Sequence, residues 1–267
     1  MKVLNLKNPF NAPVYHEETV SSTFDAARAL AQGNEAHGTV ITADFQEAGR
    51  GRLKRSWTAE PGKNLLFTIL LRYGDVPAIP EALTLRTGLA LSLAIEDLVP
   101  ALCGSVKVKW PNDIMIAPHK AQAAFKAQAA FKAAGILTEA DGKNVYIGVG
   151  VNVSQREFPA AHRCKAGSLI QVYPSLMANA RFLLLEKILS RLYEEIETVQ
   201  KAGSWRAPLA GRLYKKDETV TFAAGAADTD QLIEGTLIGL GPGGELLLVP
   251  KGEKGERAFV TGELRVY

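Results

Sequence analysis

A cluster of arginines and glycines at residues 49–57 is the strongest chemical signal in this sequence. The segment reads GRGRLKRSW, so four cations stand close together and two glycines let the backbone approach a ligand. A guanidinium group binds both oxygens of a phosphate or carboxylate at once, and Trp57 offers a flat apolar surface. The segment therefore predicts an anion-binding loop that is mobile without its ligand, because its cations repel one another. The alternative is a solvated basic loop.

A second motif, KWPND at residues 109–113, places an amide and a carboxylate directly after an expected strand. Ligands bind at the ends of strands in open sheets, and a carboxylate there can accept hydrogen bonds or hold Mg²⁺. The alternative is an ordinary strand exit, in which the Asn and Asp side chains bond the turn.

Glycines inside two expected strands, at residues 134–139 and 145–153, form the third signal. Gly148 and Gly150 lie within the second strand, and Lys132 stands just before the first. A glycine in a strand usually marks the close approach of a ligand or another backbone, and a lysine entering such a strand can reach a buried anion. Packing of the glycines beneath helices is the alternative interpretation.

Periodicity and turn signals predict the elements that hold these motifs. The expected helices are 23–32, which opens with a capping-box pattern, 81–99 and 176–200, and further strands are expected at 38–42, 64–72 and 106–110. From residue 219 the chain changes to short β-prone runs separated by glycines, which predicts a small all-β unit as a partly open barrel. The expected domains are 1–214 and 215–267.

Residues 120–131 consist of two copies of KAQAAF. Two copies are too few for a solenoid, and the two phenylalanines lie on different sides of any helix that the segment forms. We expect a low-complexity surface insertion, helical or mobile, with contact to a partner protein as the alternative.

Composition and charge exclude several classes of protein. Hydrophobic residues make up 47% and charged residues 22% of the 267 residues, which is typical of a globular protein. A net charge of +3 speaks against a general nucleic-acid or membrane polycation. The two cysteines are too few for a disulfide framework, and there is neither a signal-peptide pattern nor an apolar run of about 18 residues. We therefore expect a cytoplasmic protein with no membrane partner.

The order of the three motifs resembles that of the biotin protein ligases, across residues 15–267. The similarity rests on GRGR followed by Trp57, on KWPND, and on the GIL-T-E and GVGVN strands, with GELLL and GEL in the C-terminal unit. The resemblance implies an α+β fold, in which a mixed β-sheet flanked by helices forms a class II synthetase-like catalytic core. It also implies a small C-terminal SH3-like β-barrel.

The same resemblance implies an ATP-dependent ligase. Biotin would be activated as biotinyl-5′-AMP, with Mg²⁺ and loss of pyrophosphate, and then transferred to a specific lysine of a biotin carboxyl carrier protein. A lipoyl or octanoyl transferase of the same fold is the alternative. Two further alternatives are a nucleic-acid-binding protein that uses residues 49–57, which the small net charge disfavours, and a catalytically inactive binding module. The implied partners are biotin, ATP and the carrier protein, without nucleic acid, and a homodimer is left open.

Site residues follow from the resemblance, position by position. The implied catalytic residues are Lys132, Arg50, Arg52 and Asp113, with Asp113 also the implied Mg²⁺ ligand or partner of the acceptor lysine. The implied biotin-binding residues are Ser22, Thr23, Gln46, Arg50, Arg52, Lys132, Gly135 and Leu137. The implied ATP-binding residues are Arg50, Arg52, Arg55, Trp57, Asn112, Lys132 and Asn152.

Three departures from the family pattern bear on these assignments. Leu53 and Lys54 stand where many relatives have a glycine, which would stiffen the loop. The repeat places either Lys120 or Lys132 after KWPND, and we assign the active-site role to Lys132 because it directly precedes the AAGI start of the strand. About 15 residues precede the core, too few for the winged helix-turn-helix domain of the family's repressor members, so no operator binding is expected.

Overall fold

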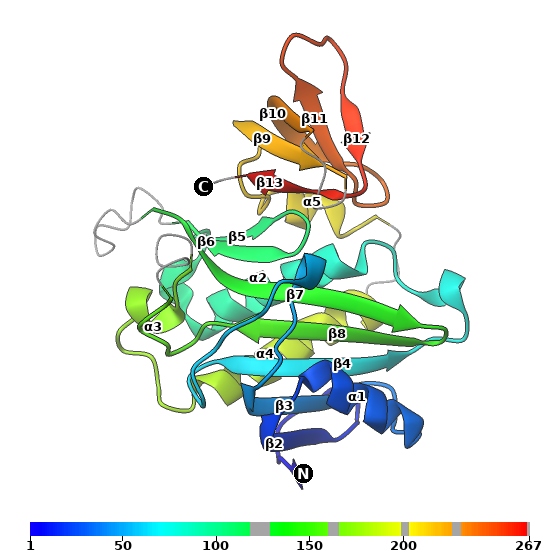
Figure 1. Ribbon diagram of the computed structural model, residues 1–267, viewed down its shortest axis with the longest axis vertical. Coiled ribbons are helices and arrows are strands. Elements are labelled where there is room, and N and C mark those ends of the chain that lie inside the picture. The colour runs from blue at the N-terminus through cyan, green and yellow to red at the C-terminus, as the bar shows by residue number, and fades with distance from the viewer. Residues whose placement is uncertain (118–128, 160–165, 199–202, 226–230, 266–267) are drawn as a thin grey trace.

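Two β-sheets of unequal size organise the chain (Figure 1). The computed structural model describes residues 1–117, 129–159, 166–198, 203–225 and 231–265. Within these ranges, eight strands form a mixed sheet in the order β1-β2-β3-β4-β8-β7-β6-β5, and five strands form a second sheet in the order β12-β11-β10-β9-β13. Helices cover the larger sheet, so the structure confirms the predicted α+β fold with a mixed sheet flanked by helices.

The observed elements follow the predicted pattern closely. The strands of the larger sheet are β1 (Lys2–Val3), β2 (Val14–Val20), β3 (Thr39–Gln46), β4 (Leu65–Arg72), β5 (Val106–Lys109), β6 (Asp113–Ile116), β7 (Phe131–Asp141) and β8 (Asn144–Val151). The helices are α1 (Thr23–Gln32), α2 (Leu83–Leu98), α3 (Leu169–Val172), α4 (Ala180–Tyr193) and α5 (Arg206–Ala210). Short turns are η1 (Arg52–Lys54), η2 (Val76–Ala78), η3 (Pro100–Leu102) and the π turn η4 (Glu194–Thr198). The second sheet consists of β9 (Thr219–Ala224), β10 (Leu232–Leu240), β11 (Leu246–Pro250), β12 (Arg257–Phe259) and β13 (Gly262–Arg265).

Helix α1 connects the two parallel strands of the larger sheet. β2 and β3 pair in parallel, whereas the other described pairs are antiparallel, and a parallel pair needs a crossover connection. The predicted capping residue Ser22 starts this crossover helix, because its side chain accepts a hydrogen bond from the Phe24 N–H. Asp25 lies in the first turn, where the helix dipole favours a negative charge. The capped end of α1 is therefore fixed over one face of the sheet.

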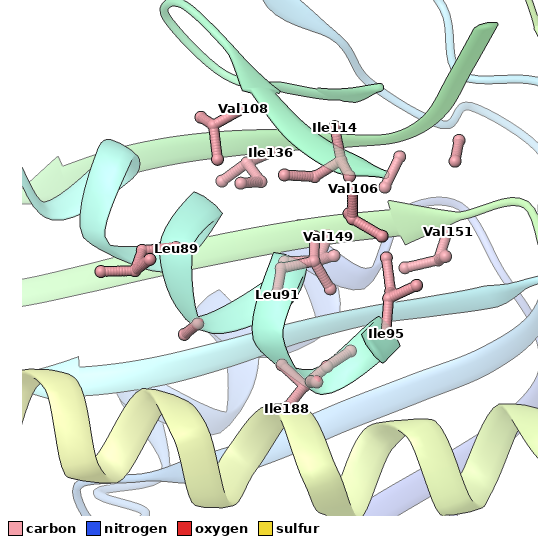
Figure 2. Close-up of a cluster of buried hydrophobic side chains, with 14 of the residues drawn as sticks. Leu89, Leu91, Ile95, Val106, Val108, Ile114, Ile136, Val149, Val151 and Ile188 are labelled. Carbon is pink, nitrogen blue, oxygen red and sulfur yellow. The ribbon is translucent and has the colours of Figure 1, made fainter. Parts of the chain in front are cut away.

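Helices α2 and α4 cover the opposite face of the sheet. Figure 2 shows Leu91 and Ile95 of α2 with Val149 of β8 on one side and Ile188 of α4 on the other. All four side chains are buried. The described segment Val76–Leu98 is long and apolar enough to cross a membrane by length and composition alone, and 61% of its most apolar window is buried inside the structure. In this fold, α2 is the central helix of the core.

The second sheet shares the core of the first. The Trp110 indole nitrogen donates to the Gly244 carbonyl at 2.9 Å, and its ring lies 5.9 Å from that of Phe222. One continuous hydrophobic cluster includes Trp110 and extends to Leu264 of β13. The tryptophan of KWPND thus joins the sheets and brings β13 toward the loop at residues 49–57. The division at residue 215 and the SH3-like closure of the second sheet stay predictions.

The KAQAAF repeat falls mostly outside the described residues. Lys120 and the rest of its segment up to residue 128 lie there. Phe131, the last residue of the predicted insertion, instead opens β7 and is 6% exposed, because it pairs with Ile116 of β6. Phe131 thus belongs to the sheet, and Lys132 is the second residue of β7. The choice of Lys132 over Lys120 as the active-site lysine stays a prediction.

Truncation of Ile188 tests the packing of α4 on α2. Ile188 is 0% exposed, and removal of a buried isoleucine side chain leaves a cavity. We expect Ile188→Ala to lower the free energy of unfolding by about 2–5 kcal/mol in urea denaturation. Ser190→Ala, at an exposed position of the same helix, is the control and should stay within about 0.5 kcal/mol of the wild type. An equal loss in both variants would contradict the packing described.

Candidate active site

One cavity, of about 740 Å³, collects the three motifs found in the sequence. Its walls come from the N-terminus of α1, the loop between β3 and β4, the β5–β6 turn, β7, β8 and β13. The predicted site residues that line it are Thr23, Gln46, Arg50, Arg52, Arg55, Trp57, Asn112, Asp113, Lys132, Gly135, Leu137 and Asn152. Seven of its lining side chains are cationic and two are carboxylates, so the cavity favours an anionic ligand.

Ser22 is the predicted site residue that does not line this cavity. Its side chain is 1% exposed, and its oxygen accepts the Phe24 N–H as the cap of α1. The Ser22 oxygen thus caps the helix as an acceptor, and its predicted contact with biotin stays a prediction. Ser22 holds the next residue, Thr23, at the cavity wall.

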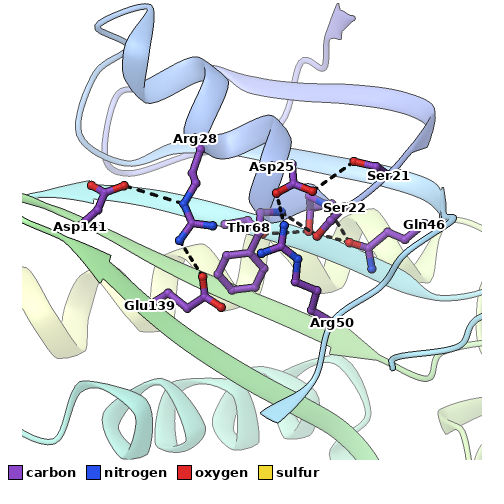
Figure 3. Close-up of polar contacts among 11 residues, drawn as sticks. Ser21, Ser22, Asp25, Arg28, Gln46, Arg50, Thr68, Glu139 and Asp141 are labelled. Atoms are coloured by element: carbon purple, nitrogen blue, oxygen red, sulfur yellow. Dashed lines mark hydrogen bonds and ion pairs between the residues drawn. The ribbon is translucent and has the colours of Figure 1, made fainter. Parts of the chain in front are cut away.

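The arginines of residues 49–57 have partners within the protein. Arg50 forms an ion pair with Asp25 of α1 (Figure 3). The other two pairs tie the loop to distant elements: Arg52 donates to the Asn112 side-chain oxygen at 3.3 Å, and Arg55 donates to both carboxylate oxygens of Glu263 at 2.8 and 2.7 Å. Polar groups on three other elements thus contact the arginines of the loop, and its mobility without ligand stays a prediction.

Leu53 and Lys54 adopt the left-handed backbone conformation, with φ of 58° and 59°. This region suits glycine and costs roughly 1–2 kcal/mol for other residues. A glycine at either position would adopt this conformation without strain. With Leu53 and Lys54 there, the backbone of the loop is strained. The flanking contacts of Arg52 and Arg55 hold the strained turn closed.

Asp113 lies between two lysines. Its Oδ1 is 2.6 Å from the Lys132 ammonium, and its Oδ2 is 3.5 Å from that of Lys109. Lys109 is 3% exposed, and burial lowers its pKa while Asp113 opposes that shift. Lys109 is a site residue that the motifs did not indicate, although side chains alternate along a strand and Lys109 and Val108 therefore face opposite sides. The carboxylate is thus held by two ammonium groups at the cavity wall.

The strand glycines make room for two aromatic rings. A Cβ added at Gly150 would lie 2.4 Å from the Trp57 ring, and one at Gly135 would lie 3.0 Å from it. A Cβ at Gly148 would lie 2.2 Å from Phe24 of α1, so packing beneath a helix is the correct interpretation for this glycine. The Trp57 ring itself lines the cavity, and the Lys132 ammonium lies 5.5 Å from its centroid.

A neutral polar group closes the end of the cavity near α1. The Thr23 backbone N–H and its hydroxyl both donate to the Gln46 Oε1, at 2.8 and 3.0 Å. Because a backbone N–H can only donate, the atom that receives it must be the amide oxygen. The Gln46 amide nitrogen therefore lies on the side of Gly49, and the Gln46 side chain lines the cavity.

Two asparagines fix the turns around the cavity. The Asn112 side chain donates to the Ile136 carbonyl at 2.7 Å, which ties the β5–β6 turn to β7. The Asn152 side chain donates to the Gly167 carbonyl at 3.1 Å and is 4% exposed. Both line the cavity, and their predicted contacts with ATP stay predictions.

Asp113 does not form a metal site with its neighbours. Among the residues that the structure describes, no group of three or more His, Cys, Asp or Glu side chains could hold a metal ion. Two ammonium groups already balance the Asp113 carboxylate, which further disfavours a protein-bound Mg²⁺ there. The described residues therefore do not fit a resident metal.

Glu263 is the second residue that sequence reasoning missed. It joins β13 to the loop through Arg55, 208 positions away in sequence. Hydrogen bonds from Arg55 lower the pKa of Glu263 to about 2. Burial is the main cause that lowers the pKa of the neighbouring Arg52. Nothing local in the GEL triplet at residues 262–264 indicates this long-range pair.

The Arg55–Glu263 pair predicts a pH dependence of stability. A carboxylate whose pKa falls from 4.5 to about 2 on folding stabilises the folded state above pH 4.5, and this contribution is lost as the pH falls toward 2. We expect Glu263→Gln to lower Tm modestly at pH 7, because Arg55 is 55% exposed and solvent screens the pair. The difference from the wild type should shrink between pH 4.5 and 2 in thermal unfolding followed by circular dichroism.

The control is Glu234→Gln, which removes an exposed ion pair with Lys251 on the same sheet. It should change Tm little at any pH. A difference between Glu263→Gln and the wild type that stays constant down to pH 2 would show that the loss comes from packing and not from the ion pair.

Comparisons with known proteins agree with this geometry. The biotin/lipoate A/B protein ligase family model matches residues 17–152. The biotin–acetyl-CoA-carboxylase ligase of Mycobacterium tuberculosis is 32% identical over 190 residues, which cover 71% of this chain and 63% of that protein. The bifunctional ligase/repressor BirA of Bacillus subtilis is 34% identical over 166 residues, which cover 59% of this chain and 46% of that protein. This chain thus spans about half the length of the first curated relatives that it matches.

Solved structures share the fold over nearly the whole chain. The biotin protein ligase from Aquifex aeolicus, in complex with biotin and ATP, aligns with a TM-score of 0.74 and 26% identity, covering 94% of this chain and 97% of the other. The biotin protein ligase from Leishmania major, in complex with biotin, aligns with a TM-score of 0.62 and 22% identity, covering 96% and 100%. With more than half of its residues matched by the family model, this chain belongs to the biotin/lipoate A/B protein ligase family.

Proposed function

We propose that this chain is an ATP-dependent biotin ligase, which forms biotinyl-5′-AMP and transfers the biotinyl group to a lysine of a biotin carboxyl carrier domain. The observation that carries the proposal is the composition of the cavity. Cations gather around Trp57 and the β5–β6 turn, and a neutral hydrogen-bonding group lies at the α1 end. Such a cavity suits a molecule with a neutral polar head and a carboxylate tail beside a polyphosphate. The Aquifex relative, solved with biotin and ATP, supports the same pair of ligands.

The first step joins two anions. A biotin carboxylate oxygen attacks the α-phosphorus of ATP, and the bond from that phosphorus to the pyrophosphate oxygen breaks. Repulsion between the reactants must be offset by fixed cations, and a water-poor site makes those cations more effective. Arg52 and Lys132 meet the same turn, through Asn112 and Asp113, and are suited to hold the two reacting groups together.

The second step transfers the acyl group. The acceptor lysine nitrogen attacks the acyl carbon of the adenylate, the bond from that carbon to the phosphate oxygen breaks, and AMP leaves. The nitrogen must also lose a proton. Of the two carboxylates that line the cavity, Asp113 lies beside Lys132 and is the one proposed to receive it. Lys109 keeps the Asp113 carboxylate in place when Lys132 turns to the substrate.

The polar end of the cavity favours biotin over a lipoyl or octanoyl group. Gln46 presents a donor there, and the cyclic urea of biotin carries a carbonyl oxygen that can accept it. The dithiolane ring of lipoate and the octanoyl chain carry no such acceptor. A buried donor without a partner disfavours those ligands.

Three further features belong to the proposal. Mg²⁺ would enter as part of MgATP, where it neutralises phosphate oxygens, because the described residues offer no metal site of their own. The printed name of the Mycobacterium relative refers to acetyl-CoA carboxylase, which supports a carrier domain of such an enzyme as the acceptor. A cytoplasmic location and a homodimer are also proposed, and neither alters the chemistry of the cavity.

Substitution of the two central cations tests the first step. We expect Arg52→Ala and Lys132→Ala each to reduce biotinyl-adenylate formation at least about 100-fold, because each removes a fixed charge from the reacting groups. Pyrophosphate exchange that depends on biotin measures this step. Lys120→Ala is the matched control for the lysine register and should retain exchange.

Mass spectrometry of a carrier domain incubated with biotin, MgATP and the protein tests the whole reaction. The expected result is one added biotinyl group, absent without ATP. Modification with lipoate or octanoate in place of biotin would favour the acyltransferase alternative. Loss of exchange in Lys120→Ala but not in Lys132→Ala would show that the repeat sets a different register.

A further inference from the structure

Thr68 lies directly behind the polar end of the cavity. It sits in the middle of β4 and is 0% exposed, and it is not among the cavity-lining residues (Figure 3). Its hydroxyl is 2.8 Å from the Thr23 hydroxyl. A polar side chain on a strand of nearly continuous apolar residues needs a hydrogen-bond partner, and here that partner is a residue of the binding wall.

The direction of each hydrogen bond in this group is fixed by the Thr23 backbone. The Thr23 N–H can only donate, so Gln46 must present Oε1 to it. The Thr23 hydroxyl, 3.0 Å from the same oxygen, must then donate its one proton to Gln46. Since that proton is used, the contact between the two threonine hydroxyls requires Thr68 to donate and Thr23 to accept.

We propose that Thr68 is a positioning residue for ligand specificity, which orients the Thr23 hydroxyl and so sets the donor and acceptor pattern that the cavity presents. With Thr68 donating, Thr23 keeps an oxygen lone pair as an acceptor, and Gln46 keeps its amide N–H groups as donors. A cyclic urea offers the complementary groups, an N–H and a carbonyl oxygen. This inference rests on the proposed biotin-ligase function, and Thr68 itself touches no substrate.

Binding of biotin to four variants tests this proposal by calorimetry without ATP. Thr68→Val keeps the side-chain shape and removes the donor, and it should weaken biotin binding about 3- to 10-fold, the effect of one hydrogen bond. Thr68→Ser restores the donor and should bind within about twofold of the wild type. In a Thr23→Val background, Thr68→Val should cause no further loss, because its effect passes through the Thr23 hydroxyl.

Thr42→Val is the matched control. Thr42 is a buried threonine on the adjacent strand β3, and its hydroxyl donates to the Leu66 carbonyl at 2.8 Å, outside the cavity. Its loss should leave biotin affinity unchanged, even if it lowers Tm. Affinity for ATP should be unchanged in the Thr68 and Thr42 variants, which shows that the cavity is still folded.

Three results would overturn the proposal. The first is wild-type biotin affinity in Thr68→Val. The second is a loss of biotin affinity on adding Thr68→Val to Thr23→Val that equals the loss in Thr68→Val alone. The third is the same loss of biotin affinity in Thr42→Val. Desthiobiotin, which retains the cyclic urea, should lose affinity by the same factor as biotin. Failure of the wild-type protein to bind biotin would instead overturn the proposed function, and this inference with it.

Discussion

Mutual repulsion among the cations around the cavity is the constraint on which the rest of the structure depends. Seven basic side chains line one space, and such an arrangement is unfavourable without counter-charges. The chain supplies them from three distant places: Asp25 at the start of α1, Asp113 at the β5–β6 turn and Glu263 in β13. Each is fixed by a different part of the fold, so the folded protein holds anionic groups of its own around the space where anionic substrates are proposed to react.

This constraint explains why a small second sheet belongs to the site. Trp110 packs against Phe222 and bonds Gly244, which fixes the second sheet against the first. Glu263 is thereby held within reach of Arg55. The KWPND segment thus has two functions in one turn: its tryptophan places the second sheet, and its asparagine and aspartate hold the cations of the site.

Sequence patterns predicted the parts of the site that are encoded locally. Glycine spacing, a run of arginines and a strand-ending turn each carry their chemistry within a few residues, and the structure brings them to one cavity. Lys109, Thr68 and Glu263 could not be found in this way. The role of a lysine or threonine in a strand depends on the side chains of the elements packed beside it, which the local sequence does not contain. The pairing of Glu263 with Arg55 depends on the arrangement of two sheets, which no periodicity reports.

Two groups that the sequence analysis linked to ligand binding also have partners within the protein. Ser22 was assigned to ligand binding, yet its oxygen is used to cap α1. The cations of residues 49–57 were expected to repel one another, yet Asp25 and Glu263 pair with Arg50 and Arg55. The mobility of the loop without ligand stays a prediction. In both cases a local pattern had two possible partners, and the tertiary structure selected the intramolecular one.

The placement of the aromatic side chains has a practical consequence. The sequence has three tryptophans, of which Trp110 and Trp205 are 3% and 2% exposed in the core, whereas Trp57 borders the cavity beneath the Lys132 ammonium. Indole emission responds to nearby charge and to water. Of the three tryptophans, Trp57 is therefore the one placed to report on occupation of the cavity by its emission, without any added label.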